Sequence, residues 1–233
     1  MEINPETRKK LIVSADDFGL RIEANEKILQ LIRQGKIDRV AILADGQYTQ
    51  AEIRELLQSG VKLDIHLDIE THKSAEQEMK QSVAKRVFLF FVKYLAGKMT
   101  SEKIRLEWKR QTKKFIRIFG QKPDGINSHE HLHFFPAYFA IALSLADQFD
   151  IGYIRLGKKR ALGKNNPAAL VMSLFSKKNQ RLLKASKLAS SDFLVSFDWI
   201  GSKEKFFQNL PAGKIEIVFH PERKEEFEAM ECF

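Results

Sequence analysis

Short apolar runs alternate with stretches of helical periodicity along the first part of the chain. LIVSA at 11–15, VAILA at 40–44 and VKLDIHLDI at 61–69 have the length and the β-branched content of strands, and a helix-like stretch follows each. Gly35 and Gly60 come directly after periodic segments, where C-terminal helix caps are expected. This βαβα order predicts a parallel sheet covered by helices.

The remainder of the chain continues the alternation with one interruption. Residues 80–119 predict two helices separated by Gly97, the second capped by Ser101. Further strands are expected for DGINSHEHLHF at 124–134, IGYIRL at 151–156, DFLVSF at 192–197 and KIEIVFHP at 214–221. The lysine-rich stretch at about 158–190 is a helical excursion from the repeat. About seven parallel strands result, so we expect one α/β domain over residues 1–233, close to a (β/α) barrel.

Composition indicates the solubility and the cellular compartment of this domain. Hydrophobic residues make up 44% and charged residues 30% of the chain, the balance of a soluble globular protein. The lone cysteine, Cys232, excludes an intramolecular disulfide and a cysteine-based zinc cage. The opening stretch MEINPETRKK lacks the apolar run of a secretory signal. We therefore expect a cytoplasmic protein.

The net charge and one apolar run are evidence about membrane and nucleic-acid partners. VFLFFVKYLAG at 87–97 is far shorter than the roughly 20 apolar residues of a spanning helix. The lysines around it are compatible with a helix lying on anionic lipid, and equally with a core helix whose lysines are solvated. The net charge of +9 attracts phosphate at long range, but charge alone is weak evidence and no nucleic acid partner is expected. Peripheral membrane contact and a homodimer are both left open.

Titratable side chains collect where the expected strands end. In a (β/α) barrel these carboxyl ends face the active-site mouth. Asp16 and Asp17 follow the first strand, and five of the six histidines lie at strand ends, His72 being the exception. The other candidates are His66, His129, His131, His133, Arg155 and His220. The sequence thus predicts one compact polar site.

The segment NSHEHLHFFP places three histidines at every second position. On a strand, His129, His131 and His133 share one face, with neighbours about 6.6 Å apart, so at most two of them bind the same ion. A metal site open to water needs roughly three protein ligands. The missing ligands come from elsewhere in the chain, and Asp17 and His66 are suitably placed.

The paired aspartates suggest two different roles. Asp16 and Asp17 point in opposite directions on a regular strand, but both enter the mouth if the chain bends near Gly19. A carboxylate bound to a cation stays ionised, while its neighbour is free to accept a proton. Taken alone, the pair is equally compatible with capping of the next helix.

SADDFG, IHLDI, INSHEHLHFFP and VFHPE, in this order and at this spacing, resemble the YdjC-like, or ChbG-like, carbohydrate deacetylases, which include chito-oligosaccharide deacetylases. The resemblance runs from about Leu11 to Glu222 and is weakest in the lysine-rich stretch. It implies a distorted TIM-like barrel. It also implies one divalent ion, Mg²⁺ or Zn²⁺, held by Asp17, His66 and His129.

The resemblance implies a reaction as well: removal of the acetyl group from an N-acetylated sugar, either a free saccharide or a lipid-linked glycan. Asp16 is then the general base, and His220 is the acid for the departing amine. His131 is the alternative acid or a substrate-binding residue. Arg155 is expected to contact the substrate or to form a surface ion pair. His133 is expected to be packed or at the surface.

Two departures and two rival classes accompany this interpretation. Asp64 and Ile65 stand where the family usually has Gly-Leu, and Glu222 replaces the usual glycine after His-Pro; both differences concern the substrate. A receiver-type signalling domain also has an acidic pocket after its first strand, but it needs no imidazoles and is shorter than this chain. A catalytically lapsed protein that docks to membrane or nucleic acid through its basic surface is the second rival.

Overall fold

A computed structural model of the chain describes residues 3–69, 99–162, 167–231 and 233. Its strands form one parallel sheet in the order β5-β4-β3-β2-β1-β8-β7-β6. They are β1 (Leu11–Phe18), β2 (Arg39–Ile42), β3 (Lys62–Leu67), β4 (Gly125–Ser128), β5 (Tyr153–Ile154), β6 (Arg160–Ala161), β7 (Phe193–Ser196) and β8 (Ile215–Phe219). The predicted distorted α/β barrel is confirmed, and β6 is the strand that the sequence did not suggest.

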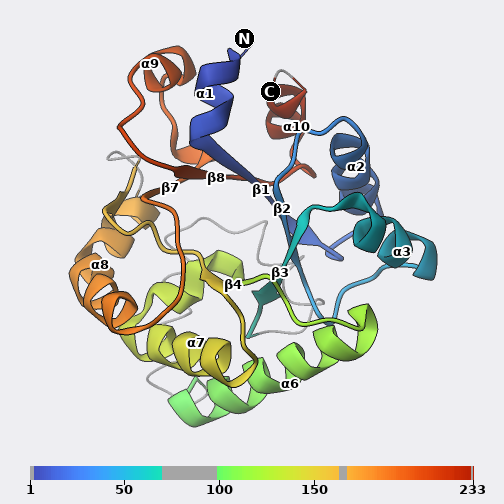
Figure 1. Cartoon of the computed structure of the whole chain (residues 1–233), viewed down its shortest axis with the longest axis vertical. Helices are drawn as coiled ribbons and strands as arrows, with labels where there is room; N and C mark the ends of the chain where they lie inside the picture. The colour runs from blue at the N-terminus through green and yellow to red at the C-terminus, as the bar shows by residue number, and fades with distance from the viewer. Residues whose placement is uncertain (1–2, 70–98, 163–166, 232) are drawn as a thin grey trace.

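Helices surround this sheet, as Figure 1 shows. The α-helices are α1 (Pro5–Lys10), α2 (Ile22–Arg33), α3 (Gln50–Ser59), α6 (Ser101–Phe119), α7 (Pro136–Gln148), α8 (Pro167–Ala185), α9 (Lys203–Gln208) and α10 (Lys224–Met230). Two short 3-10 segments, η1 (His129–Phe134) and η2 (Phe197–Trp199), follow β4 and β7. None of the helices in the described ranges is both long and apolar enough to cross a membrane.

Helix ends follow the sequence signals closely. Gly60 ends α3 at φ +77°, a conformation that a side chain makes costly. The N-cap of α6 is Thr100, one residue before the expected Ser101, because the Thr100 hydroxyl accepts the N–H of Lys103. The expected helix before Gly97, with the apolar run at 87–97, lies outside the described residues.

The core lies between the sheet and the helices. β2, β7 and β8 are buried along their whole length, so they are mainly apolar on both faces, and their polar residues Arg39, Ser196 and Glu216 are buried as well. Aromatic side chains of α6 and α7, among them Trp108 and Phe139, are fully buried in the same core. Buried apolar area is the main source of stability here.

The strand order determines which residues meet. β1 lies between β2 and β8, and β3 and β4 follow on the β2 side. All pairs are parallel, so the carboxyl ends of β1, β3, β4 and β8 lie at one edge of the sheet. Residues from the beginning, middle and end of the chain are thereby brought together.

Candidate metal centre

A bulge in β1 directs the two aspartates to different partners. Ala15 pairs with Val40 and Phe18 with Ile42, so three steps along β1 match two along β2. Asp17 lies inside this irregularity at φ +69°. Asp16 and Asp17 are both buried, yet they contact different groups. The expected bend that brings both carboxylates inward is therefore present, within the strand and ahead of Gly19.

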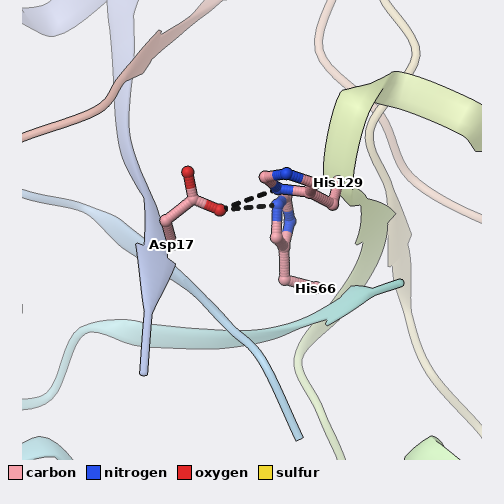
Figure 2. A group of neighbouring side chains, drawn as sticks. All are labelled: Asp17, His66 and His129. Carbon is pink, nitrogen blue, oxygen red and sulfur yellow. Dashed lines mark hydrogen bonds and ion pairs between the residues drawn. The ribbon is translucent and has the colours of Figure 1, made fainter. Parts of the chain in front are cut away.

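Asp17 meets two imidazoles, as Figure 2 shows. Its Oδ1 lies 3.0 Å from Nδ1 of His129 and 3.3 Å from Nε2 of His66. One ligand atom from each of the three residues lies within 4.8 Å of the others. The side chains of Asp17 and His66 are each 3% exposed and that of His129 is 16% exposed, so the centre is reached from the His129 side.

The donor set fits a divalent cation. Burial acts to raise the pKa of Asp17, but His129 and His66 outweigh it and hold that pKa well below its usual range. Burial lowers the pKa of His129, yet Asp17 raises it to about 10. The buried carboxylate thus requires positive charge beside it, which a bound cation also supplies. One carboxylate oxygen with two imidazole nitrogens suits several divalent ions, zinc and magnesium among them.

Asn127 orients one of these imidazoles, and sequence reasoning missed it. Its Oδ1 is an acceptor, so it takes the Nδ1–H of His66 in a short hydrogen bond. Nε2 of His66 is then left as a lone-pair donor facing Asp17. Asn127 is fully buried at the penultimate position of β4, next to His66 in the parallel register.

The expected histidine strand is wrong. β4 ends at Ser128, and the chain enters η1, where Glu130 and His131 both have φ of +53°. Alternation along a strand therefore does not relate the three histidines. His129 turns toward Asp17, whereas the His131 ring lies 5.3 Å from Trp199, between ring centroids. Trp199 is buried, as core packing requires.

His133 is a structural residue, in agreement with expectation. It is fully buried, and its Nδ1 accepts the hydroxyl of Ser128 at 2.7 Å. Its Nε2–H donates to the carbonyl of Arg155 at 2.9 Å. Burial lowers the pKa of His133 to about 3, so the ring is neutral. His133 consequently ties the end of β4 to the backbone of Arg155.

Arg155 is neither at the surface nor free for substrate, contrary to both expectations. Its side chain is fully buried, and its Nη1 and Nη2 donate to the two oxygens of Asp16 at 2.6 and 2.8 Å. Its Nε donates to Glu216 at 2.7 Å. Burial raises the pKa of Asp16, but Arg155 outweighs burial and holds it at about 2. Arg155 is a positioning residue for Asp16.

Glu216 is the second residue that sequence reasoning missed. It is fully buried in β8 and accepts the Ser14 hydroxyl at 2.9 Å and the Tyr153 hydroxyl at 2.6 Å. The signal was present, because an acidic residue inside an apolar strand has to be paired. Asp64 behaves similarly: it is buried against Arg39, at 2.5 and 2.8 Å, and is not a solvated group.

His220 lies after β8 with a carboxylate beside it. Its backbone N–H donates to Oε2 of Glu226 at 2.8 Å, and its Nδ1 lies 3.5 Å from the same oxygen. Burial lowers the pKa of His220, but Glu226 raises it to about 9. The ring carries a proton near neutral pH. His131, by contrast, has its pKa lowered well below 6.5 by burial and by Arg155, so it is neutral.

Comparison with known proteins identifies a family and several relatives of this chain. The family model described as YdjC-like protein matches residues 10–232. A chitooligosaccharide deacetylase of Escherichia fergusonii is 32% identical over 139 residues, 58% of this chain and 55% of that protein. A carbohydrate deacetylase of Danio rerio is 23% identical over 159 residues, 65% of this chain and 51% of that protein. The chain spans about half the length of the curated relatives it matches.

One solved structure shares the fold over nearly the whole chain. It belongs to a protein from Enterococcus faecalis V583 that is named for cellobiose-phosphate cleavage. The TM-score is 0.64 at 20% sequence identity, and the match covers 91% of this chain and 80% of the other. At this identity the likeness concerns the fold.

Proposed function

Because the chain belongs to the YdjC-like family, we propose that it is a metal-dependent hydrolase that removes the acetyl group from an N-acetylated sugar. The observation that carries this proposal is the convergence of Asp17, His66 and His129, whose ligand atoms lie within 4.8 Å of one another. The relatives named as chitooligosaccharide and carbohydrate deacetylases support the substrate class. The family also argues against the receiver-type signalling domain.

Three side chains would hold the proposed ion. They are Asp17 through Oδ1, His66 through Nε2 and His129 through Nδ1, and Mg²⁺ and Zn²⁺ both suit the set. When bound, such an ion would supply Lewis acidity and would lower the pKa of water, so that hydroxide is available near neutral pH. Asn127 fixes the ring of His66 for this purpose.

Asp16 accepts the proton in this proposal. It neighbours Asp17 in the chain, and its carboxylate is held by two hydrogen bonds from Arg155. The pKa of about 2 keeps it ionised, although the same pairing weakens it as a base. Arg155 therefore contributes geometry: it holds the acceptor oxygens in one place while the proton moves.

His220 donates the proton to the departing nitrogen. It is protonated near neutral pH because Glu226 lies beside it. His131 is proposed to contact the sugar, since its Nδ1 is buried and has no hydrogen-bond partner within the described chain. This assignment separates the acid from the substrate-binding residue.

Acetate release from a panel of N-acetylated sugars and glycolipids, with and without chelator, tests the proposal. The purified protein is expected to carry about one divalent ion per chain. Asp17→Asn and His129→Ala should lose both the ion and the activity, whereas Asp16→Asn should keep the ion and lose activity about 10²-fold or more. Asp150→Asn, an exposed aspartate, is the control. Metal-loaded protein that releases no acetate from any substrate indicates the lapsed binding protein instead.

A further inference from the structure

Glu222 is a buried carboxylate without a hydrogen-bond partner. It follows His220 and Pro221 at the carboxyl end of β8, and its side chain is 11% exposed. Neither carboxylate oxygen is reached by solvent, and neither is hydrogen-bonded within the part of the chain that the structure describes. Nε of Arg223 lies 3.7 Å from Oε1, which is too far for a hydrogen bond. Burying a carboxylate without hydrogen-bond donors costs free energy, which the nearby charges of Arg223 and His220 offset only in part.

This carboxylate belongs to the same edge of the sheet as the proposed metal ligands. β8 pairs with β1, so the residues after Phe219 lie beside those after Ala15. Burial and the charge of Asp17 raise the pKa of Glu222, while His220 and Arg223 oppose them. Hydrogen-bond donors for Glu222 therefore have to come from a molecule that binds in the proposed substrate site.

The partner that Glu222 lacks is a neutral hydrogen-bond donor. Glu222 is not part of the described cluster that brings three ligand atoms within 4.8 Å, so the proposed ion does not satisfy it. His220 does not supply the donor either: its Nδ1 lies 3.5 Å from Oε2 of Glu226, and Glu222 has no hydrogen bond from it within the described chain. Sugar hydroxyl groups are donors, and one carboxylate accepts from two neighbouring hydroxyls.

We propose that Glu222 binds the substrate by accepting hydrogen bonds from hydroxyl groups of the sugar next to its acetamido group. It is a specificity-determining residue, because a simple acetamide offers no such donors. The inference rests on the proposed function and extends it: the substrate has free hydroxyls at the reacting sugar. It also gives a reason for retaining a carboxylate whose burial weakens the fold.

Glu222→Gln tests the inference with three readouts on metal-loaded protein. With N,N′-diacetylchitobiose as substrate, KM should rise about tenfold, since hydrogen bonds to a charged group are worth roughly that factor or more, and kcat should stay within about twofold. The melting temperature should change little, because Glu222 has no hydrogen bond to lose and its ion-pair contact with Arg223 is long. The metal content should be unchanged. Glu225→Gln, an exposed neighbour on α10, is the matched control.

Failure of the inference about Glu222 and failure of the proposed function give different results. An unchanged KM, or a lower melting temperature with an unchanged KM, means that Glu222 is structural and overturns the inference alone. If the wild type releases no acetate from any sugar, the proposed function fails, and calorimetric titration of the same disaccharide decides the inference. Tighter binding to the wild type than to Glu222→Gln then supports a sugar contact, while equal binding or no binding overturns it.

Discussion

At the scale of single residues, the centre depends on backbone conformations that most side chains avoid. Asp17, Glu130 and His131 have φ of +69°, +53° and +53°. Such conformations cost about 1–3 kcal/mol each and persist only where the surroundings impose them. Here the imposed geometry turns Asp17 and His129 toward each other and His131 away. Asp17 and His131 also have proposed roles, whereas Glu130 and Asp150, which is likewise at φ +53°, have none, so strain alone does not mark the site.

Arg155→Met tests the buried network. Removing the guanidinium leaves Asp16 and Glu216 buried without their shared cation, so the free energy of unfolding should fall by about 3–5 kcal/mol. Urea unfolding measures this. Arg33→Met is the control: Arg33 forms an exposed pair with Glu55, and screening by water makes its loss small. Equal losses in the two variants would contradict the role assigned to the network.

Glu226→Gln tests His220 as the acid. A raised pKa keeps His220 protonated up to about pH 9, so the rate of the wild type should fall as pH rises through about 9. Arg223 lowers this pKa, and Glu226 and Asp17 raise it, so loss of the Glu226 charge should move the alkaline limb to lower pH. The pH profile of kcat measures the shift, with Glu225→Gln on the same helix as control. If the alkaline limb of the profile lies at the same pH in both variants, a group other than His220 donates the proton to the departing nitrogen.

The sequence indicated the types of site residue better than their pairings. Asp17, His66 and His129 are recognisable because each stands at or near the carboxyl end of an expected strand. Asn127 and Glu216 were missed because their partners are distant in the chain: Glu216 is 61 residues from Arg155, and Arg155 is 139 residues from Asp16. Local patterns do not encode such contacts, which the strand order creates.

At the scale of elements, strands with a continuous apolar run were predicted well, and the polar strand was not. β1, β2, β3, β7 and β8 occur where the runs lie. In NSHEHLHF the alternation suggested a strand to Phe134, but β4 ends at Ser128 because the Ser128 hydroxyl accepts the N–H of His133. Such a bond between side chain and backbone competes with sheet pairing.

Gly125→Ala tests how closely β4 packs on the neighbouring strands. A Cβ at Gly125 would lie 2.5 Å from Oδ1 of Asp64 and 2.6 Å from Nη2 of Arg39, so the buried pair would have to move. The variant should be destabilised by about 1–3 kcal/mol, as measured by denaturant unfolding. In Gly152→Ala nothing lies within 4 Å of the added carbon, so its stability should be nearly unchanged. If the two variants are equally stable, the Arg39–Asp64 pair moves aside without loss of free energy.

At the scale of the whole molecule, the positive charge is not spread evenly. α8 carries no acidic residue, and its exposed face presents Leu174, Lys177, Lys178, Arg181 and Lys184. Among the described residues, none of these four cations has an acidic partner within ion-pair distance. The apolar run at 87–97, for which membrane contact was left open, lies outside the described residues, so α8 is the described surface on which that alternative now rests. Cytoplasmic location and a homodimer stay predictions.

Cosedimentation with vesicles tests this surface. Exposed cations attract an anionic leaflet within about 8 Å at physiological ionic strength, so binding to vesicles containing phosphatidylserine should be measurable and should weaken as salt is added. Replacing the four cations of α8 by glutamine should abolish binding. Replacing Arg105, Lys109, Lys113 and Arg117 of α6 lowers the net charge equally and is the control. Equal loss in both variants would mean that net charge, rather than α8, attracts the protein to lipid, and a lipid-linked substrate would lose its structural support.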